Sequence, residues 1–214
     1  MVNTSPGKAV LIGDNLISAE MFSERSVALR EAGFTITTLS WVFEDRNEMN
    51  RRSLRIERFG PEIESPPLGL SEEIRDATIL ITHFAPISRD MIAAGAKLQV
   101  IGVARGGWEN VNVNVATQFG IPVLHIKGRN ANAVAEYTVG MILCEMRNIA
   151  RSHSTMRQGE WYKIDPNSSY ELANKTVGLI GFGAVGQLVA RRLSRTYFKI
   201  WLTHHRMTAN KQKA

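Results

Sequence analysis

The chain has 214 residues, of which 44% are hydrophobic, and a formal net charge of +6. This length suits one large domain or two small ones, and the hydrophobic share is enough for a buried core. No uninterrupted apolar run approaches the ~20 residues that cross a bilayer, and residues 1–8 lack the charged-then-apolar order of a signal peptide. We therefore expect a cytoplasmic, soluble protein that has no membrane partner.

The cysteine content and the charge distribution exclude two further classes. Cys144 is the only cysteine, so the chain can form neither an intrachain disulfide nor a multi-thiolate metal site. Nucleic-acid surfaces usually gather basic residues on one element, whereas here they are dispersed, with the densest runs at 51–55 and 204–213. We interpret the first run as a solvated face and expect neither a nucleic-acid partner nor a metal.

Short apolar runs and helical patterns alternate along the first 126 residues. Apolar segments predict strands at 9–13, 34–39, 78–82, 98–103 and 121–126, and helical spacing predicts helices at 18–31, 88–94 and 111–118. The polar stretch 62–70 contains Pro66 and Pro67 and is expected to be a loop. This alternation predicts an α/β fold in which helices cover both faces of a parallel sheet.

A longer helical pattern runs from Asn130 to about His153. Apolar residues recur along it at the spacing of one helix face. Its length suits a single helix that crosses between two domains.

Residues 176–193 have the pattern of a phosphate-binding turn. Gly181, Gly183 and Gly186 form G-x-G-x-x-G between an apolar strand and a helical stripe. The first glycine would allow the tight turn, the second would let the backbone approach a pyrophosphate, and the third would let strand and helix pack closely. The N–H groups of Ala184 and Val185 would then hold phosphate oxygens. A glycine-rich turn without a ligand is the alternative.

The residues that would contact the cofactor's ribose are unusual. Such sites place an acidic residue ~20 positions after the glycines, but that position falls near His204, and no Asp or Glu follows Glu171. His204, His205 and Arg206 would either favour the 2′-phosphate of NADP or belong to a segment that is not the second strand of the site. We expect NAD as the cofactor, with NADP as the alternative.

Three more segments, together with the late position of the glycine turn, resemble the D-isomer-specific 2-hydroxyacid dehydrogenases. Residues 76–82 are similar to the strand before the family's substrate loop, 100–111 to that loop, and 128–140 to the start of its interdomain helix. The resemblance covers 8–193. It implies a flavodoxin-like substrate lobe at residues 1–109. An incomplete, Rossmann-type doubly wound cofactor domain would follow at 110–214, with an atypical tail from about residue 194.

The resemblance implies an NAD(P)-dependent oxidoreductase that interconverts a D-2-hydroxy acid and its 2-oxo acid by hydride transfer. Arg105, Gly106 and Gly107 would bind the substrate carboxylate through backbone N–H groups and a guanidinium, whose fork suits a carboxylate. Gly106 would also lie near the nicotinamide. The alternatives are a surface arginine or a partner of Glu109 for Arg105, and a plain strand-to-helix turn for the glycines. The resemblance also suggests a homodimer formed through the interdomain helix.

The family's catalytic trio comprises an Arg that binds the substrate, a Glu, and a His that this Glu holds as general acid or base. All three come from the later part of the cofactor domain, and residues 173–214 have room for only two strands and a helix. We expect the trio to be absent and assign no catalytic residue. His83, His125 and His153 are poor substitutes because none stands in the family's order relative to a glutamate, and His125 is expected to be a hydrogen-bonded core residue.

The resemblance stops abruptly after Leu193. Back-translating residues 200–204 and moving the frame by two nucleotides permits Leu-Val-Asp-Pro, close to the strand end that the family has there. We therefore expect that a frameshift replaced the family's continuation from near Ser194 onward.

Three functions remain open at this point. The first is a dehydrogenase, the second is a catalytically inactive module that binds nucleotide or dimerises, as a corepressor would, and the third is a decayed gene product. Fold alone does not choose among them.

Overall fold

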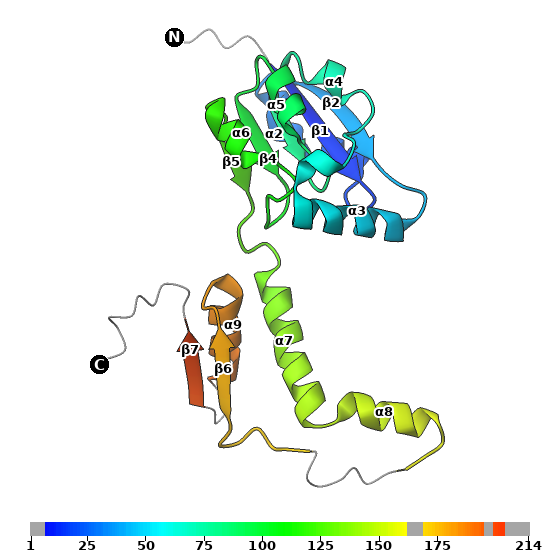
Figure 1. Ribbon diagram of the computed structural model, residues 1–214, viewed down its shortest axis with the longest axis vertical. Coiled ribbons are helices and arrows are strands. Elements are labelled where there is room, and N and C mark those ends of the chain that lie inside the picture. Colours follow the sequence, from blue (N-terminus) through cyan, green and yellow to red (C-terminus); the bar gives the residue numbers. More distant parts are fainter. Residues whose placement is uncertain (1–6, 162–168, 195–198, 204–214) are drawn as a thin grey trace, which may run out of the picture. The chain divides into compact units, whose positions relative to one another are not determined.

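The computed structural model describes residues 7–161, 169–194 and 199–203 (Figure 1). The chain divides into two compact units, Met1–Lys127 and Gly128–Ala214. This division falls later than the expected boundary after Glu109, because helix α6 (Val113–Gln118) and strand β5 (Val123–His125) continue the architecture of the first unit.

A five-stranded, fully parallel sheet forms the centre of the first unit (Figure 1). Its strands lie in the order β2-β1-β3-β4-β5. The bounds of the first four are Lys8–Asp14 (β1), Thr35–Trp41 (β2), Ala77–Thr82 (β3) and Val100–Val103 (β4). This is the flavodoxin-like order, in which the chain changes direction across the sheet between β1 and β3. The α/β class expected from the sequence is confirmed.

Short helices connect these strands. They are α1 (Ala19–Arg25), α2 (Val27–Glu31), α3 (Arg46–Phe59), the 3-10 turn η1 (Pro61–Ile63), α4 (Leu70–Glu73), α5 (Arg89–Ala94) and α6. The helix expected at 18–31 is divided at Ser26, whose hydroxyl donates to the carbonyl of Ser23. Helix α3 was not expected. It begins at the cap Asp45, whose carboxylate accepts from the N–H of Asn47.

One contiguous hydrophobic core holds the first unit together. Its members include Val10, Ile12, Leu80, Ile101 and Val103 from the strands and Met49, Ile56, Ile74, Ile92 and Val115 from the helices. The residues of β1, β3 and β4 that point to this side are buried because helices cover them. The core fixes the carboxyl ends of β1, β3 and β4, where the polar loops begin.

The second unit is a strand–helix–strand motif preceded by two helices. Its elements are α7 (Ala131–Met146), α8 (Ile149–Arg157), β6 (Thr176–Ile180), α9 (Ala184–Leu193) and β7 (Lys199–Thr203). Strands β6 and β7 pair in parallel. Ala135 of α7 packs with Val189 and Leu193 of α9 in a second, smaller core.

The single helix expected from 130 to 153 is wrong, because the chain breaks between α7 and α8. Asn148 adopts the left-handed conformation with φ 55° and is buried. Its side-chain oxygen accepts from Arg151, and the carbonyl of Met146 at the end of α7 accepts from the N–H of Tyr170. These hydrogen bonds replace the continuous helical ladder, which periodicity alone does not reveal.

Strand β7 lies within the segment expected to be atypical, and its partner is β6. His204, His205 and Arg206 lie outside the described residues. Over the described ranges, no helix is long and apolar enough to cross a membrane, and no group of three or more His, Cys, Asp or Glu side chains is placed to hold a metal ion.

Candidate functional site

The first candidate site lies in the loops that follow β3 and β4. Strand β3 ends at Thr82 and β4 ends at Val103. Because the two strands are parallel neighbours, the loops that follow them meet at one edge of the sheet. This edge contains Arg105, Gly106 and Gly107, the predicted substrate-binding residues.

The guanidinium of Arg105 is held on several sides within this loop. Its Nη2 donates to Oε1 of Glu57 on α3 at 2.5 Å and lies 3.6 Å from Oε2 of Glu109. Its central carbon lies 4.3 Å from the ring centre of Phe84, close enough for a cation–π contact. The side chain is only 15% exposed. Arg105 is therefore not a free surface arginine, and its nearest carboxylate partner is Glu57, with Glu109, the partner named in the alternative interpretation, farther away.

Gly106 and Gly107 keep their backbone close to solvent. Neither has a positive φ, so neither needs to be glycine for conformational reasons. A Cβ at Gly106 would approach only the carbonyl oxygen of Ile126, at 3.7 Å. A Cβ at Gly107 would collide with the carboxylate of Glu109. Among the described residues, the N–H groups of the two glycines donate to no protein acceptor.

His125 fixes this loop from β5. Its Nδ1 lies 2.8 Å from the carbonyl oxygen of Gly106. A carbonyl can only accept, so Nδ1 carries the proton in this contact. The imidazole also packs edge-on against Trp108, with ring centres 4.7 Å apart. The expectation that His125 is hydrogen-bonded is met in this structure, although its side chain is only partly buried.

A buried carboxylate ties the end of β1 to the loop after β3. Asp14 accepts from the N–H groups of Leu16 at 2.8 Å and Ile17 at 3.0 Å. It also contacts Nδ1 of His83 at 2.8 Å and accepts from the N–H of Phe84 at 3.2 Å. Both Asp14 and His83 are almost fully buried. Sequence reasoning missed Asp14, although an aspartate that directly follows an apolar strand was the signal available.

The environment of Asp14 favours its charged form. Burial acts to raise its pKa, but the hydrogen bonds from His83, Ile17 and Leu16 outweigh burial and hold the pKa below its ordinary value of 3.8. The neighbouring Asn110 is fully buried and donates to the carbonyl oxygens of His83 at 3.3 Å and Ala85 at 3.0 Å. The loop that carries Phe84 is thus fixed from β1 and from the loop after β4.

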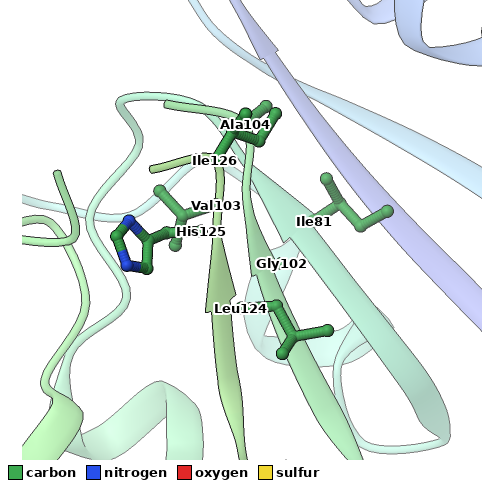
Figure 2. Close-up of a pocket in the computed structure, with 7 residues that line it drawn as sticks. All are labelled: Ile81, Gly102, Val103, Ala104, Leu124, His125 and Ile126. Atoms are coloured by element: carbon green, nitrogen blue, oxygen red, sulfur yellow. The ribbon is translucent and has the colours of Figure 1, made fainter. Parts of the chain in front are cut away.

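An apolar pocket of about 230 Å³ lies beside the start of the substrate loop. It is lined by Ile81, Gly102, Val103, Ala104, Leu124, His125 and Ile126. Figure 2 shows the imidazole of His125 on the opposite side of β5 from the side chain of Leu124. The lining contains no cationic side chain, so the pocket could hold an apolar group but would not itself recognise an acid.

The second candidate site is the glycine turn of the second unit, between β6 and α9. Gly181 has φ 92°, a conformation that strongly favours glycine. A Cβ at Gly186 would collide with the carbonyl oxygen of Gly181, whereas a Cβ at Gly183 would meet nothing within 4 Å. The first and third glycines are therefore required by the turn itself. The second leaves open space where the backbone is exposed.

This turn fits the pyrophosphate of a dinucleotide. Helix α9 begins at Ala184, and its cap Gly183 supplies no side-chain hydrogen bond. The N–H groups of Ala184, Val185 and Gly186 belong to the first turn, where they have no partner within the helix. Free N–H groups and the positive end of the helix dipole favour a phosphate. The open space at Gly183 is where such a group would approach.

The histidines do not form the family's catalytic arrangement within the described residues. The carboxylate beside His83 belongs to Asp14, not to a glutamate. The hydrogen-bond partner of His125 is a backbone carbonyl. His153 lies on an exposed position of α8.

Comparison with known proteins identifies the family to which this chain belongs. The sequence profile of the family described as D-isomer specific 2-hydroxyacid dehydrogenase, catalytic domain, matches residues 43–213. The chain therefore belongs to the D-isomer specific 2-hydroxyacid dehydrogenase family. The matched range includes the segment after Leu193, in which we had found no resemblance.

Individual relatives match over part of the chain. The chain is 39% identical over 124 residues to a hydroxypyruvate reductase of Thermotoga maritima, covering 58% of this chain and 40% of that protein. It is 38% identical over 124 residues to a D-3-phosphoglycerate dehydrogenase of Methanocaldococcus jannaschii, covering 58% and 24%. Among solved structures, an NAD-dependent formate dehydrogenase from Staphylococcus aureus in complex with NAD matches with a TM-score of 0.61 and 25% identity, covering 97% and 57%. The chain thus spans less than half the length of these two curated relatives.

Proposed function

We propose that this chain belongs to an NAD-dependent oxidoreductase that interconverts a D-2-hydroxy acid and its 2-oxo acid. The observation that carries this proposal is the glycine turn, where Gly181 and Gly186 are required by backbone geometry and Gly183 leaves room for a ligand. Family membership and the NAD named for the Staphylococcus aureus structure support the choice of cofactor. NADP remains the alternative.

The substrate loop would bind the acid. The N–H groups of Gly106 and Gly107 would donate to the substrate carboxylate, and the guanidinium of Arg105 would supply positive charge. Phe84 and Glu57 hold that guanidinium in place, so little side-chain entropy would be lost on binding. A bound nicotinamide would supply or accept the hydride, and this loop would orient the acid for the exchange.

The 214 residues would bind ligands rather than turn them over. A hydride-transfer reaction needs a group that moves a proton near neutral pH, and we assign no residue of this sequence to that role. We propose that these residues by themselves form a binding module that requires the family's Arg, Glu and His for activity. The outward face of α7, where Val134, Tyr137 and Met141 are exposed, would form a homodimer.

A titration with NADH tests the cofactor site. We expect the wild-type chain to bind NADH in calorimetry and Gly186→Ala to weaken binding by about tenfold or more, which is ~1.4 kcal/mol. Gly178→Ala in β6 is the matched control, because a Cβ there meets nothing within 4 Å. The proposal fails if the wild-type chain gives no heat or if Gly186→Ala binds NADH as the wild type does.

A turnover assay tests the second part of the proposal. We expect the purified chain to show no NADH-dependent reduction of glyoxylate, hydroxypyruvate or pyruvate. Clear turnover of any of the three would show that the chain contains its own proton donor, and the binding-module interpretation would be wrong.

A further inference from the structure

We propose that Glu57 and Glu109 make Arg105 selective for acids that carry a single negative charge. The inference rests on the proposed function, because it takes the acid's carboxylate to bind at this loop. It goes beyond that function by naming the residues that discriminate between substrates. Phosphorylated and dicarboxylic acids would be the ones that the loop disfavours.

The first step of the argument is the charge around the guanidinium. Arg105 contributes one positive charge, whereas Glu57 and Glu109 contribute two negative charges, at 2.5 Å and 3.6 Å from the same Nη2. These three side chains together therefore carry a net charge of about −1 before any acid binds. An incoming dianion would meet about twice the repulsion of a monoanion, since Coulomb energy scales with the product of the charges.

The second step is the shielding of the guanidinium from water. The Arg105 side chain is 15% exposed and lies over the ring of Phe84. The side chains of Glu57 and Glu109 are 36% and 46% exposed, so solvent screens part of their charge. A ligand that reaches the shielded guanidinium lies next to both carboxylates, and charges beside a partly dehydrated group interact more strongly than the same charges in bulk water.

The third step is the position of Glu57 on its helix. It lies in the last turn of α3, which ends at Phe59. The carboxyl end of a helix disfavours a negative side chain, and the hydrogen bond from Arg105 offsets this cost. That hydrogen bond keeps the Glu57 carboxylate beside the guanidinium, where it would face an incoming anion. The remaining Arg105 nitrogens and the two glycine N–H groups would accommodate one carboxylate of the ligand.

Two small acids of the same shape test the selectivity. Oxamate is a monoanion and oxalate is a dianion near pH 7, and the two differ by an amide in place of a carboxylate. NMR titrations of the purified chain would follow the Nε–H of Arg105 and the amides of Gly106 and Gly107. For the wild type we expect oxamate to bind more tightly than oxalate.

Substitutions then identify the residue responsible. Glu57→Gln is expected to raise oxalate affinity about tenfold and oxamate affinity less than about threefold, so that the preference shrinks. Glu109→Gln should act in the same direction but less, because it is farther from Nη2. Glu48→Gln is the matched control on the same helix, because Glu48 pairs with Arg52 instead. Arg105→Gln should weaken both ligands.

The outcomes separate the two proposals. If the wild-type loop binds neither acid, both the acid-binding proposal and the selectivity are overturned. If it binds both acids but Glu57→Gln leaves their ratio unchanged, or changes both affinities equally, only the selectivity is overturned. Amide spectra of each variant that match the wild type outside the loop would show that the fold is intact.

Discussion

The two candidate sites are built differently. Contacts between side chains form the site at the edge of the first sheet, whereas backbone geometry forms the glycine turn of the second unit. Asp14 receives four hydrogen-bond contacts and Arg105 lies between two carboxylates and a ring. The glycine turn instead depends on the φ of Gly181 and on the missing Cβ of Gly186. Substitutions at the first site should therefore alter the stability of its unit, and substitutions at the second should alter ligand binding more than stability.

The largest expected effect is that of Asp14→Ala. The change leaves His83 and three backbone N–H groups without their buried acceptor. Removing one partner of a buried charged network costs about 3–5 kcal/mol of unfolding free energy. Urea unfolding followed by hydrogen exchange of peptides from β1 and β3 measures this loss in the first unit alone.

Asp76→Ala is the matched control for Asp14→Ala. Asp76 is also an aspartate of the first unit, directly before β3. It pairs with Lys8, but its side chain is 58% exposed. An exposed pair contributes little to stability because water screens it. Equal losses for the two variants would show that the buried network does not stabilise this edge of the sheet.

A smaller loss of unfolding free energy is expected from substitutions that compare the two hydrophobic cores. Leu80 is fully buried in the large core of the first unit, and Leu193 is 2% exposed in the small core of the second. Leu80→Ala should cost about 3–4 kcal/mol and Leu193→Ala about 2 kcal/mol, because a small core collapses more readily around the lost volume. Hydrogen exchange in β3 and α9 reports the two losses separately. A larger loss in α9 would contradict the view that the second unit depends less on packing.

Much of the first unit's fold could be predicted because its strands are short apolar runs. The run at 78–82 corresponds to β3, and the run at 9–13 corresponds to β1. Helix α3 was missed because most of it is polar and charged, with Met49 and Ile56 among the few residues that mark its buried face. A pattern so dominated by polar residues does not distinguish a surface helix from a loop.

The two candidate sites also differ in how far the sequence alone predicts them. The glycine turn could be found in the sequence, because its three glycines follow a local steric rule and lie within six residues. Glu57 could not be found as a partner of Arg105, because it is 48 positions away in the sequence and lies on the unpredicted helix, whereas Glu109 is near in sequence and was named as a possible partner. Sequence patterns reveal backbone requirements, whereas contacts between side chains from distant segments depend on the fold.

The smallest expected effect is a dependence of the first unit's stability on acid. The pKa of Asp14 lies below its ordinary value of 3.8 in the folded chain, so the unfolded chain takes up the proton more readily. The stabilisation from this carboxylate is therefore fully present well above pH 3.8 and is lost as the pH falls through the lower pKa of the folded state.

The difference in unfolding free energy between wild type and Asp14→Asn should be constant from pH 7 to about pH 5 and should shrink below that. Urea unfolding of both proteins across this range measures it, and subtraction removes the contributions of Asp76 and Glu20, whose pKa values are also lowered. A difference that stays constant down to pH 3 would mean that His83 and the N–H groups do not favour the charged form of Asp14, and the contrast with the backbone-built turn would lose its electrostatic basis.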